Sequence, residues 1–285
     1  MYYAKTAGRN NVQFYSDIGH LRDVDRSKLA LQSRLNSAIE RGAIEVYFQP
    51  IVHPHTASVV AVEALARWHD EQEGWVSPAI FIPMAEKLGL IKELGFLVIE
   101  RALSTLRHWH KLGHHPRLAV NISRAQLFSR SYINRIITLV GENQLEPNDI
   151  ELEITESVAL TDYTNQTIHL QQLAEAGFRI AIDDFGTGYS SLSQLHNMPV
   201  DTLKIDISFT SRLHTQEGQR VVQAIVQMAQ ALGLEIVAEG VEKSTTASFL
   251  LGLGVKQMQG YYYSRPDTAL KVTALLRKGI DPSES

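Results

Sequence analysis

Short apolar segments alternate with longer amphipathic segments along most of this chain. The apolar segments are rich in β-branched and aliphatic residues, and most have the four to eight residues typical of buried strands. They predict eight strands, at Glu45–Val52, Val59–Trp68, Leu118–Ile122, Ile150–Ile154, Phe178–Ile182, Thr202–Ile205, Glu235–Ala238 and Gln257–Tyr263. The amphipathic segments predict helices over about Pro78–His110, Arg124–Glu142, Tyr163–Ala176, Ser190–Asn197, Gly218–Leu232 and Ser244–Leu251.

This alternation favours an α/β fold, a closed (β/α)8 TIM-like barrel, because eight strands close around an interior that side chains can fill. Only a handful of residues, including Pro54 and His55, separate the first two strands. A parallel pair needs a longer crossover, so we expect an antiparallel first strand. An open doubly wound sheet is the alternative, but no Gly-x-Gly-x-x-Gly follows the first strand to indicate a dinucleotide fold.

The segment before the barrel has a different pattern. Met1–Lys5 predicts the end of a helix and Val12–Tyr15 a strand, in a stretch too short for a core of its own. Ser27 is a candidate N-cap for a helix that ends at Gly42. Its apolar positions share one face: Leu31, Leu35, Ala38 and Ile39. We therefore expect a linker helix over residues 23–42 and the barrel over residues 43–285, with residues 1–22 as a docked extension or the tail of a preceding domain.

The composition narrows the classes of function. With 44% hydrophobic and 20% charged residues among 285, the chain is typical of a soluble, well-packed protein. Its net charge of -4 argues against general electrostatic binding to DNA, RNA or a membrane surface. It has no cysteine, no apolar run near the ~18 residues of a membrane span, and no secretory signal. We expect a cytoplasmic location.

Polar side chains stand at or near the ends of seven predicted strands, where barrel enzymes carry their working residues. They are Glu63 and Arg67, Asn121, Glu153 and Glu156, Asp183 and Asp184, Lys204 and Asp206, Glu239 and Glu242, and Gln259. Because these strand ends meet at one face of a barrel, the pattern predicts a single site.

The residue types indicate a metal-dependent site. Asp183 and Asp184 end one strand together, and adjacent carboxylates repel unless a cation or proton holds them. With Glu63, Asn121 and Glu153 they offer only oxygen ligands, which suit Mg²⁺ or Mn²⁺.

We expect Asp183 to bridge to a second ion held by Asp184 and Glu239, about 3.5–4 Å from the first, with a shared water deprotonated near neutral pH. Lys204 would hold that water or offset phosphate charge, and Glu239 could accept the proton.

Each of these residues also has a structural explanation. A glutamate at a strand end is often a solvated rim residue, Asn121 could cap the next helix, and Lys204 could pair with Asp206 or a nearby glutamate. The tyrosine run Tyr261–Tyr263 predicts barrel wall and core, with a base pocket as the alternative for one of its rings.

Residues from about Ala43 to Pro266 resemble EAL domains, the phosphodiesterases of cyclic di-GMP. The matching motifs occur in order: Phe48-Gln49-Pro50-Ile51-Val52, Glu63-Ala64-Leu65 with Arg67-Trp68, Val120-Asn121-Ile122-Ser123, Leu152-Glu153-Ile154-Thr155-Glu156-Ser157, Asp183-Asp184-Phe185-Gly186-Thr187-Gly188-Tyr189-Ser190-Ser191, Leu203-Lys204-Ile205-Asp206, Ala238-Glu239-Gly240-Val241-Glu242 and Gln259-Gly260-Tyr261. Asp70 departs from the pattern, since a proline is frequent there. The opening Met-Tyr-x-Ala-Lys-x-x-Gly-Arg-Asn resembles the closing segment of GGDEF (diguanylate cyclase) domains, which favours residues 1–22 as a GGDEF remnant.

The EAL resemblance implies hydrolysis of cyclic di-GMP to linear 5'-pGpG with two Mg²⁺ or Mn²⁺ ions, and Ca²⁺ is expected to inhibit. It implies that Lys204 assists the water and that Glu63, Asn121, Glu153, Asp183, Asp184 and Glu239 bind metal. The substrate-binding positions are Gln49, Leu65, Arg67, Asp206, Glu242 and Gln259. Glu156 matches the residue that steadies the loop of Phe185, Gly186, Thr187 and Gly188, which builds the dimer interface in the family.

Several expectations about the whole protein follow from the same resemblance. We expect a homodimer, and a parent protein with upstream GGDEF and sensory domains that could anchor it in a membrane. The alternatives are a catalytically weak module that senses cyclic di-GMP through dimer contacts and, less favoured, a barrel enzyme that acts on another phosphorylated substrate.

Overall fold

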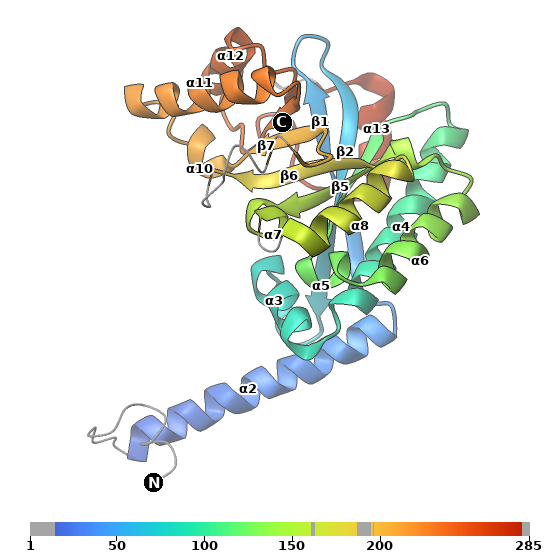
Figure 1. Ribbon diagram of the computed structural model, residues 1–285. Coiled ribbons are helices and arrows are strands. Elements are labelled where there is room, and N and C mark those ends of the chain that lie inside the picture. Colours follow the sequence, from blue (N-terminus) through green and yellow to red (C-terminus); the bar gives the residue numbers. More distant parts are fainter. Residues whose placement is uncertain (1–14, 161–162, 187–194, 196, 281–285) are drawn as a thin grey trace.

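A closed barrel forms the centre of the protein, shown in Figure 1 as a computed structural model that describes residues 15–160, 163–186, 195 and 197–280. Its strands are β1 (Glu45–His53), β2 (Ser58–Asp70), β4 (Arg117–Asn121), β5 (Ile150–Thr155), β6 (Arg179–Phe185), β7 (Thr202–Ile205), β8 (Glu235–Ala238) and β9 (Gln257–Met258). A further short strand, β3 (Gly74–Val76), pairs with β2 outside the barrel. The predicted (β/α)8 class is confirmed.

The first strand closes the barrel in the predicted antiparallel sense. β1 pairs antiparallel with β2 over its whole length and with β9 at Val52 and Met258. The pairs from β2 through β4 to β9 are all parallel. The carboxyl ends of these parallel strands therefore meet at one mouth of the barrel, as the position of the polar residues predicted.

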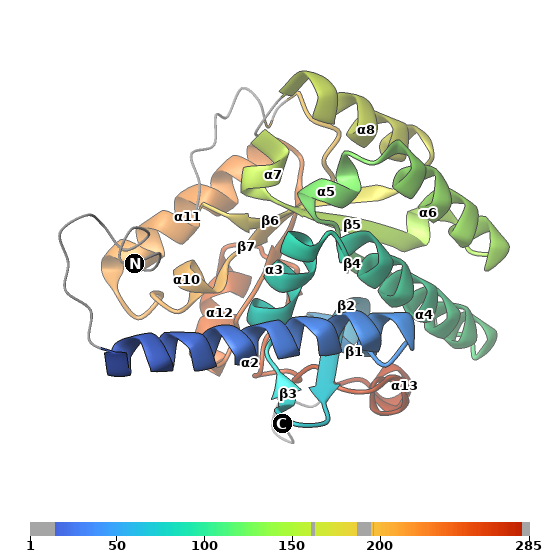
Figure 2. The same cartoon turned by 90° about the horizontal axis from the view of Figure 1, so that it is seen from below.

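Helices surround the barrel (Figures 1 and 2). They are α2 (Tyr15–Glu40), α3 (Pro78–Leu88), α4 (Ile91–Lys111), α5 (Arg124–Leu127), α6 (Arg130–Glu142), α7 (Glu156–Leu160), α8 (Tyr163–Glu175), α10 (Ile207–Thr210), α11 (Gln216–Ala231), α12 (Ser244–Gly252) and α13 (Ala269–Lys278), with a 3-10 turn at Pro147–Asp149. Within the described residues, none of these helices has the length and apolar character needed to span a membrane.

Several predicted boundaries were wrong for local reasons. The helical segments predicted over about Pro78–His110 are two helices, α3 and α4, and the chain turns between them at Gly89, whose φ of 74° suits glycine. The Arg124–Glu142 segment is likewise divided into α5 and α6. The last strand stops at Met258, and Tyr261–Tyr263 forms a turn instead. Most of the helix predicted at Ser190–Asn197 lies outside the described residues.

The linker helix is longer than the sequence predicted. α2 begins at Tyr15, so Ser27 lies inside the helix and does not cap it, and Tyr15 is not part of a strand. Residues 1–14, with the GGDEF-like motif, lie outside the described part. The predicted boundary at residue 22 falls within this continuous helix, and the assignment of residues 1–22 stays a prediction.

The carboxyl-terminal half of α2 packs into a second hydrophobic core beside the barrel core. Leu35, Ala38 and Ile39 are buried there, as the shared face predicted, against Trp68 of β2 and Phe81 of α3. Figure 2 shows α2 crossing the molecule next to α3. This core attaches the helix to β2, the strand that carries Glu63.

An ion pair reinforces this attachment. Arg34 Nε of α2 lies 2.8 Å from Asp70 Oδ2 at the end of β2, and Asp70 is only 4% exposed. Asp70 also accepts hydrogen bonds from the backbone N–H groups of Gln72 and Glu73. The departure from the family pattern at Asp70 therefore supplies a partner for the linker helix.

Candidate active site

Lys204 lies at the centre of a group of carboxylates at the barrel mouth. Its Nζ is 2.8 Å from Glu153 Oε1 and 2.7 Å from Glu239 Oε1, with Asp183 Oδ1 at 3.5 Å and Glu63 Oε2 at 3.8 Å. The Lys204 side chain is 1% exposed and that of Glu153 is fully buried. The barrel therefore brings together side chains from β2, β5, β6, β7 and the end of β8 around one ammonium group.

The Glu63 carboxylate is held by two amides from other strands. Asn121 Nδ2 donates to Glu63 Oε1 at 2.8 Å, and Gln259 Nε2 donates to Glu63 Oε2 at 2.6 Å. Gln259 also donates to Gln49 Oε1 at 3.0 Å, and Gln49 stands directly opposite Glu63 in the β1–β2 register. The antiparallel first strand thus places Gln49 on the same face as the carboxylates.

The carboxylates outnumber the cations in this site, and their pKa values differ accordingly. Burial raises the pKa of Glu153 well above its usual range, in spite of Lys204, and burial raises the pKa of Glu239 to about 8. The pKa of Glu63 is lowered, because Lys204 and the two amide hydrogen bonds outweigh its burial. Burial and the charge of Asp183 raise the pKa of Asp184. The site lacks positive charge.

The donor set fits a hard divalent cation. All the side-chain donors are carboxylate or amide oxygens, and additional cations would compensate the buried negative charge that Lys204 balances only in part. As the side chains stand, no set of three or more histidine, aspartate or glutamate residues in the described part of the chain has the arrangement of a metal site. The carboxylates converge on Lys204 Nζ instead.

A strained turn follows the two aspartates. Asp184 has a φ of 55°, in the left-handed region that few residues other than glycine adopt, and Gly186 follows with a φ of 95°. Glu156 Oε2 accepts a hydrogen bond from the Gly186 N–H at 2.6 Å, and Glu156 is buried. This is the contact that a loop-steadying role for Glu156 requires. Phe185 is buried at the end of β6, while Thr187 and Gly188 lie outside the described residues.

A cavity of about 310 Å³ opens above the carboxylates. Of the predicted substrate-binding residues, Gln49, Leu65, Glu242 and Gln259 line it, together with Glu63, Asp183 and Glu239. Arg67 lines a neighbouring cavity of about 480 Å³, with its guanidinium carbon 5.7 Å from the centre of the Tyr47 ring. Asp206 is not among the residues that line either cavity, and its carboxylate caps α10 by accepting from the Ser208 N–H at 2.9 Å.

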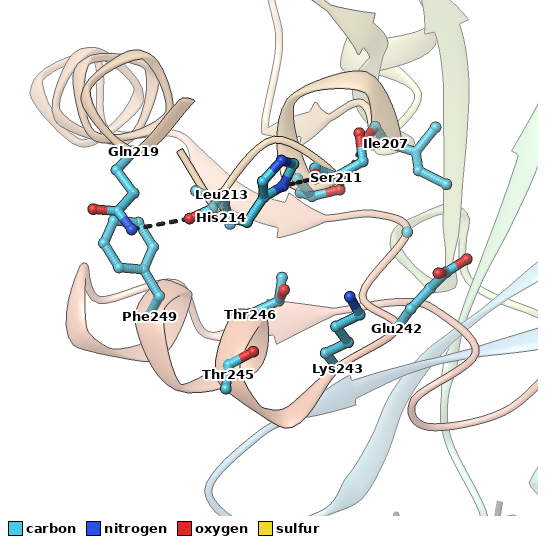
Figure 3. Close-up of a pocket in the computed structure, with 12 residues that line it drawn as sticks. Ile207, Ser211, Leu213, His214, Gln219, Glu242, Lys243, Thr245, Thr246 and Phe249 are labelled. Atoms are coloured by element: carbon cyan, nitrogen blue, oxygen red, sulfur yellow. Dashed lines mark hydrogen bonds between the residues drawn. The ribbon is translucent and has the colours of Figure 1, made fainter. Parts of the chain in front are cut away.

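A groove continues from this cavity between α10–α11 and α12 (Figure 3). Ile207, Gly240 and Glu242 line both the cavity and the groove, whose volume is about 470 Å³. His214 and Lys243 lie farther along it (Figure 3).

Some lining residues were not predicted from the sequence. Ile207 lines the cavity although it is apolar and follows Asp206 in a short helix, and no periodicity marks it. Arg265 stacks over Tyr261, with its guanidinium carbon 4.0 Å from the ring centre. Tyr261 lines the cavity and Tyr263 is buried, so the tyrosine run supplies both the wall and the core. The only signal in the sequence for these residues is that they lie close in the chain to the predicted site residues Asp206 and Gln259.

The family model of the EAL domain matches residues 32–266. This chain belongs to the EAL domain family. Relatives of this EAL domain include the bifunctional diguanylate cyclase/cyclic di-GMP phosphodiesterase MucR of Pseudomonas aeruginosa, 38% identical over 276 residues, which cover 96% of this chain and 40% of MucR. The oxygen sensor protein DosP of Escherichia coli is 35% identical over 268 residues, 93% of this chain and 33% of DosP. The chain therefore spans less than half the length of these relatives.

Solved EAL structures have the same fold as this domain. The PaMucR phosphodiesterase in complex with c-di-GMP superimposes with a TM-score of 0.82 at 38% identity, covering 85% of this chain and 99% of that one. The EAL enzyme Bd1971, in its form with cAMP and cyclic di-GMP bound, has a TM-score of 0.84 at 31% identity, covering 92% of this chain and 72% of that one. These similarities support the predicted barrel independently of its motifs.

Proposed function

We propose that this EAL domain hydrolyses one phosphodiester bond of cyclic di-GMP to give linear 5'-pGpG. The observation that carries the proposal is the group of four carboxylates around Lys204 Nζ at the base of a cavity. Its relatives support the choice of substrate, because MucR is named as a cyclic di-GMP phosphodiesterase and its phosphodiesterase domain has been solved with c-di-GMP.

The proposed metal ligands are the six oxygen-bearing side chains named from the sequence, for two Mg²⁺ or Mn²⁺ ions: Glu63, Asn121, Glu153, Asp183, Asp184 and Glu239. Two such cations would polarise the phosphodiester and lower the pKa of a water molecule. The proposed role of Lys204, whose ammonium group lies among these carboxylates, is to hold a water or a phosphate oxygen beside them.

Glu239 is the proposed proton acceptor. In the metal-free site burial, only partly offset by Lys204, raises the pKa of Glu239 to about 8, so this carboxylate takes up a proton readily near neutral pH. The Glu239 side chain is 19% exposed, more than those of Glu153 and Glu63, so a substrate in the cavity can reach it. The same cavity offers the amides Gln49 and Gln259 and the carboxylate Glu242 for the nucleotide, with Leu65 as an apolar wall. Arg67 and Asp206 stay predicted substrate contacts.

The proposal is tested with purified protein, Mg²⁺ or Mn²⁺ and cyclic di-GMP, by following the appearance of pGpG. Glu63→Ala and Glu239→Ala should abolish turnover, whereas Glu146→Ala, which alters a glutamate away from the barrel mouth, should not. Retained turnover in both site variants would contradict the proposal. Tight binding of cyclic di-GMP without turnover in the unaltered protein would favour a sensing module instead.

We also propose a wider context for the domain. Residues 1–22 are assigned to a GGDEF remnant on their motif, and the GGDEF–EAL arrangement named for MucR supports an upstream GGDEF domain. The homodimer is proposed because the sequence after Asp184 resembles the loop that builds the dimer interface in the family. Inhibition by Ca²⁺, the cytoplasmic location and the lack of nucleic acid binding stay predictions from the sequence.

A further inference from the structure

The backbone of Glu239 leaves the barrel sheet and needs partners elsewhere. Its N–H still donates to the Ile205 carbonyl of β7 at 3.0 Å. The next residue, Gly240, turns the chain with a φ of 62°. The hydrogen bonds between this segment and Gln259 are made by the Ala238 carbonyl and the Val241 N–H, not by Glu239. The Glu239 carbonyl is partly buried and has no partner in the sheet, and a carbonyl shielded from water without a donor is destabilising.

Thr210 supplies that donor. Its Oγ1 donates to the Glu239 carbonyl at 2.6 Å, with a longer contact of 3.2 Å to the Ile207 carbonyl in its own helix. Thr210 lines the groove but is only 2% exposed, so this bond is largely shielded from water. Thr210 lies on α10, which directly follows β7, the strand of Lys204.

Helix α10 also packs closely against the turn at Gly240. A Cβ added to Gly240 would lie 2.2 Å from Cγ1 of Ile207, so the helix rests directly against the turn. Figure 3 shows Ile207 and Glu242 on the two sides of this end of the groove. Both peptide groups that flank the Glu239 Cα are thus bonded to the β7–α10 segment, and Lys204 is part of that segment.

We propose that Thr210 is a positioning residue for Glu239: its hydroxyl fixes the Glu239 backbone so that the carboxylate stays 2.7 Å from Lys204 Nζ. The role assigned to Glu239 in turnover rests on the proposed function. The geometric part of the proposal does not, because it concerns only the backbone of residues 239–242.

The test compares two changes at one position. Thr210→Val keeps the shape and removes the hydroxyl, whereas Thr210→Ser keeps the hydroxyl. In the folded proteins we expect Thr210→Val to lower kcat for cyclic di-GMP about tenfold or more with KM within about threefold, because a displaced group weakens the reaction more than binding. Thr210→Ser should stay within about twofold of the unaltered protein. Thr138→Val is the matched control, since Thr138 bonds the Asn134 carbonyl on an exposed helix face.

Amide hydrogen exchange separates this proposal from the proposed function. Thr210→Val should speed exchange at residues 239–242 relative to Thr210→Ser, while the rest of the barrel is unchanged. An unaltered protein without turnover would overturn the proposed function, and the exchange comparison would still decide the role of Thr210. Equal exchange in the Val and Ser variants, or equal loss of kcat in both, would overturn the Thr210 proposal.

Discussion

Lys204 Nζ and Glu153 Oε1 lie 2.8 Å apart inside the barrel, where the lysine side chain is 1% exposed and the glutamate side chain is fully buried. Burial lowers the pKa of an isolated lysine, yet the surrounding carboxylates raise the pKa of Lys204 well above its usual range. The ammonium group is therefore charged at all working pH values. It is the structural counter-charge of the site as well as a candidate catalytic group.

The first prediction concerns this counter-charge. Lys204→Met leaves the buried carboxylates without their partner, and we expect it to lower the free energy of unfolding by about 3–5 kcal/mol as well as to abolish turnover. Urea unfolding followed by circular dichroism measures the effect. Lys271→Met removes an exposed partner of Asp267 and should change stability little. A Lys204→Met protein as stable as the unaltered one would contradict this prediction. It would show that the carboxylates become protonated without any net loss in the free energy of unfolding.

The second prediction concerns divalent cations. Because cations that bind only the folded site stabilise it, Mg²⁺ or Mn²⁺ added to metal-free protein should raise the free energy of unfolding by about 2.7 kcal/mol at a concentration near a hundred times the Kd. The thermal midpoint measures this, and Glu63→Ala or Asp183→Asn should reduce the shift. Ca²⁺ should raise the midpoint without supporting turnover. If the thermal midpoint of both Glu63→Ala and Asp183→Asn still rises as much as that of the unaltered protein, the cations bind outside this site.

The third prediction concerns the ion pair that holds the linker helix. Burial alone would raise the pKa of Asp70, but the hydrogen bond and charge of Arg34 and two backbone N–H bonds lower it overall. A depressed pKa adds stability above the unfolded-state pKa, and this stability is lost as the pH falls through the folded-state value. Asp70→Asn should therefore cost about 1–3 kcal/mol near pH 7 and less near pH 3, below the unfolded-state pKa.

Urea unfolding of the unaltered protein and of Asp70→Asn at both pH values measures this difference. Asp149→Asn, which alters another aspartate far from Arg34, is the control. A difference that stays constant with pH would mean that the pair stabilises the fold through shape and hydrogen bonding rather than charge.

The fourth prediction concerns the strained turn at Asp184. A left-handed φ costs a residue other than glycine roughly 1–2 kcal/mol, so Asp184→Gly should stabilise the fold slightly while abolishing turnover. Ala57, with a φ of 54° in the β1–β2 turn, provides the comparison. Ala57→Gly should also stabilise slightly and leave turnover intact. A loss of stability in Asp184→Gly beside a gain in Ala57→Gly would contradict this prediction.

The sequence by itself determined the class of fold and the residue types that the barrel brings to its mouth. Most strands are short and apolar, and their polar residues lie in or next to them in the chain, so local pattern was enough to predict both. The antiparallel first strand followed from the short connection after His53. Boundaries failed where the chain turns before its apolar pattern ends, as after Met258, or where a helix continues past a candidate cap, as at Ser27.

Only the tertiary structure decided which of these groups contact each other. The partners of Lys204 come from strands that are far apart in the chain, and the pairs Arg34–Asp70 and Thr210–Glu239 also join distant segments. Such contacts depend on the register and closure of the barrel, which place strand ends within a few ångströms of one another. The residue types therefore predicted an acidic site, and the closed barrel determined that its carboxylates surround one buried ammonium group.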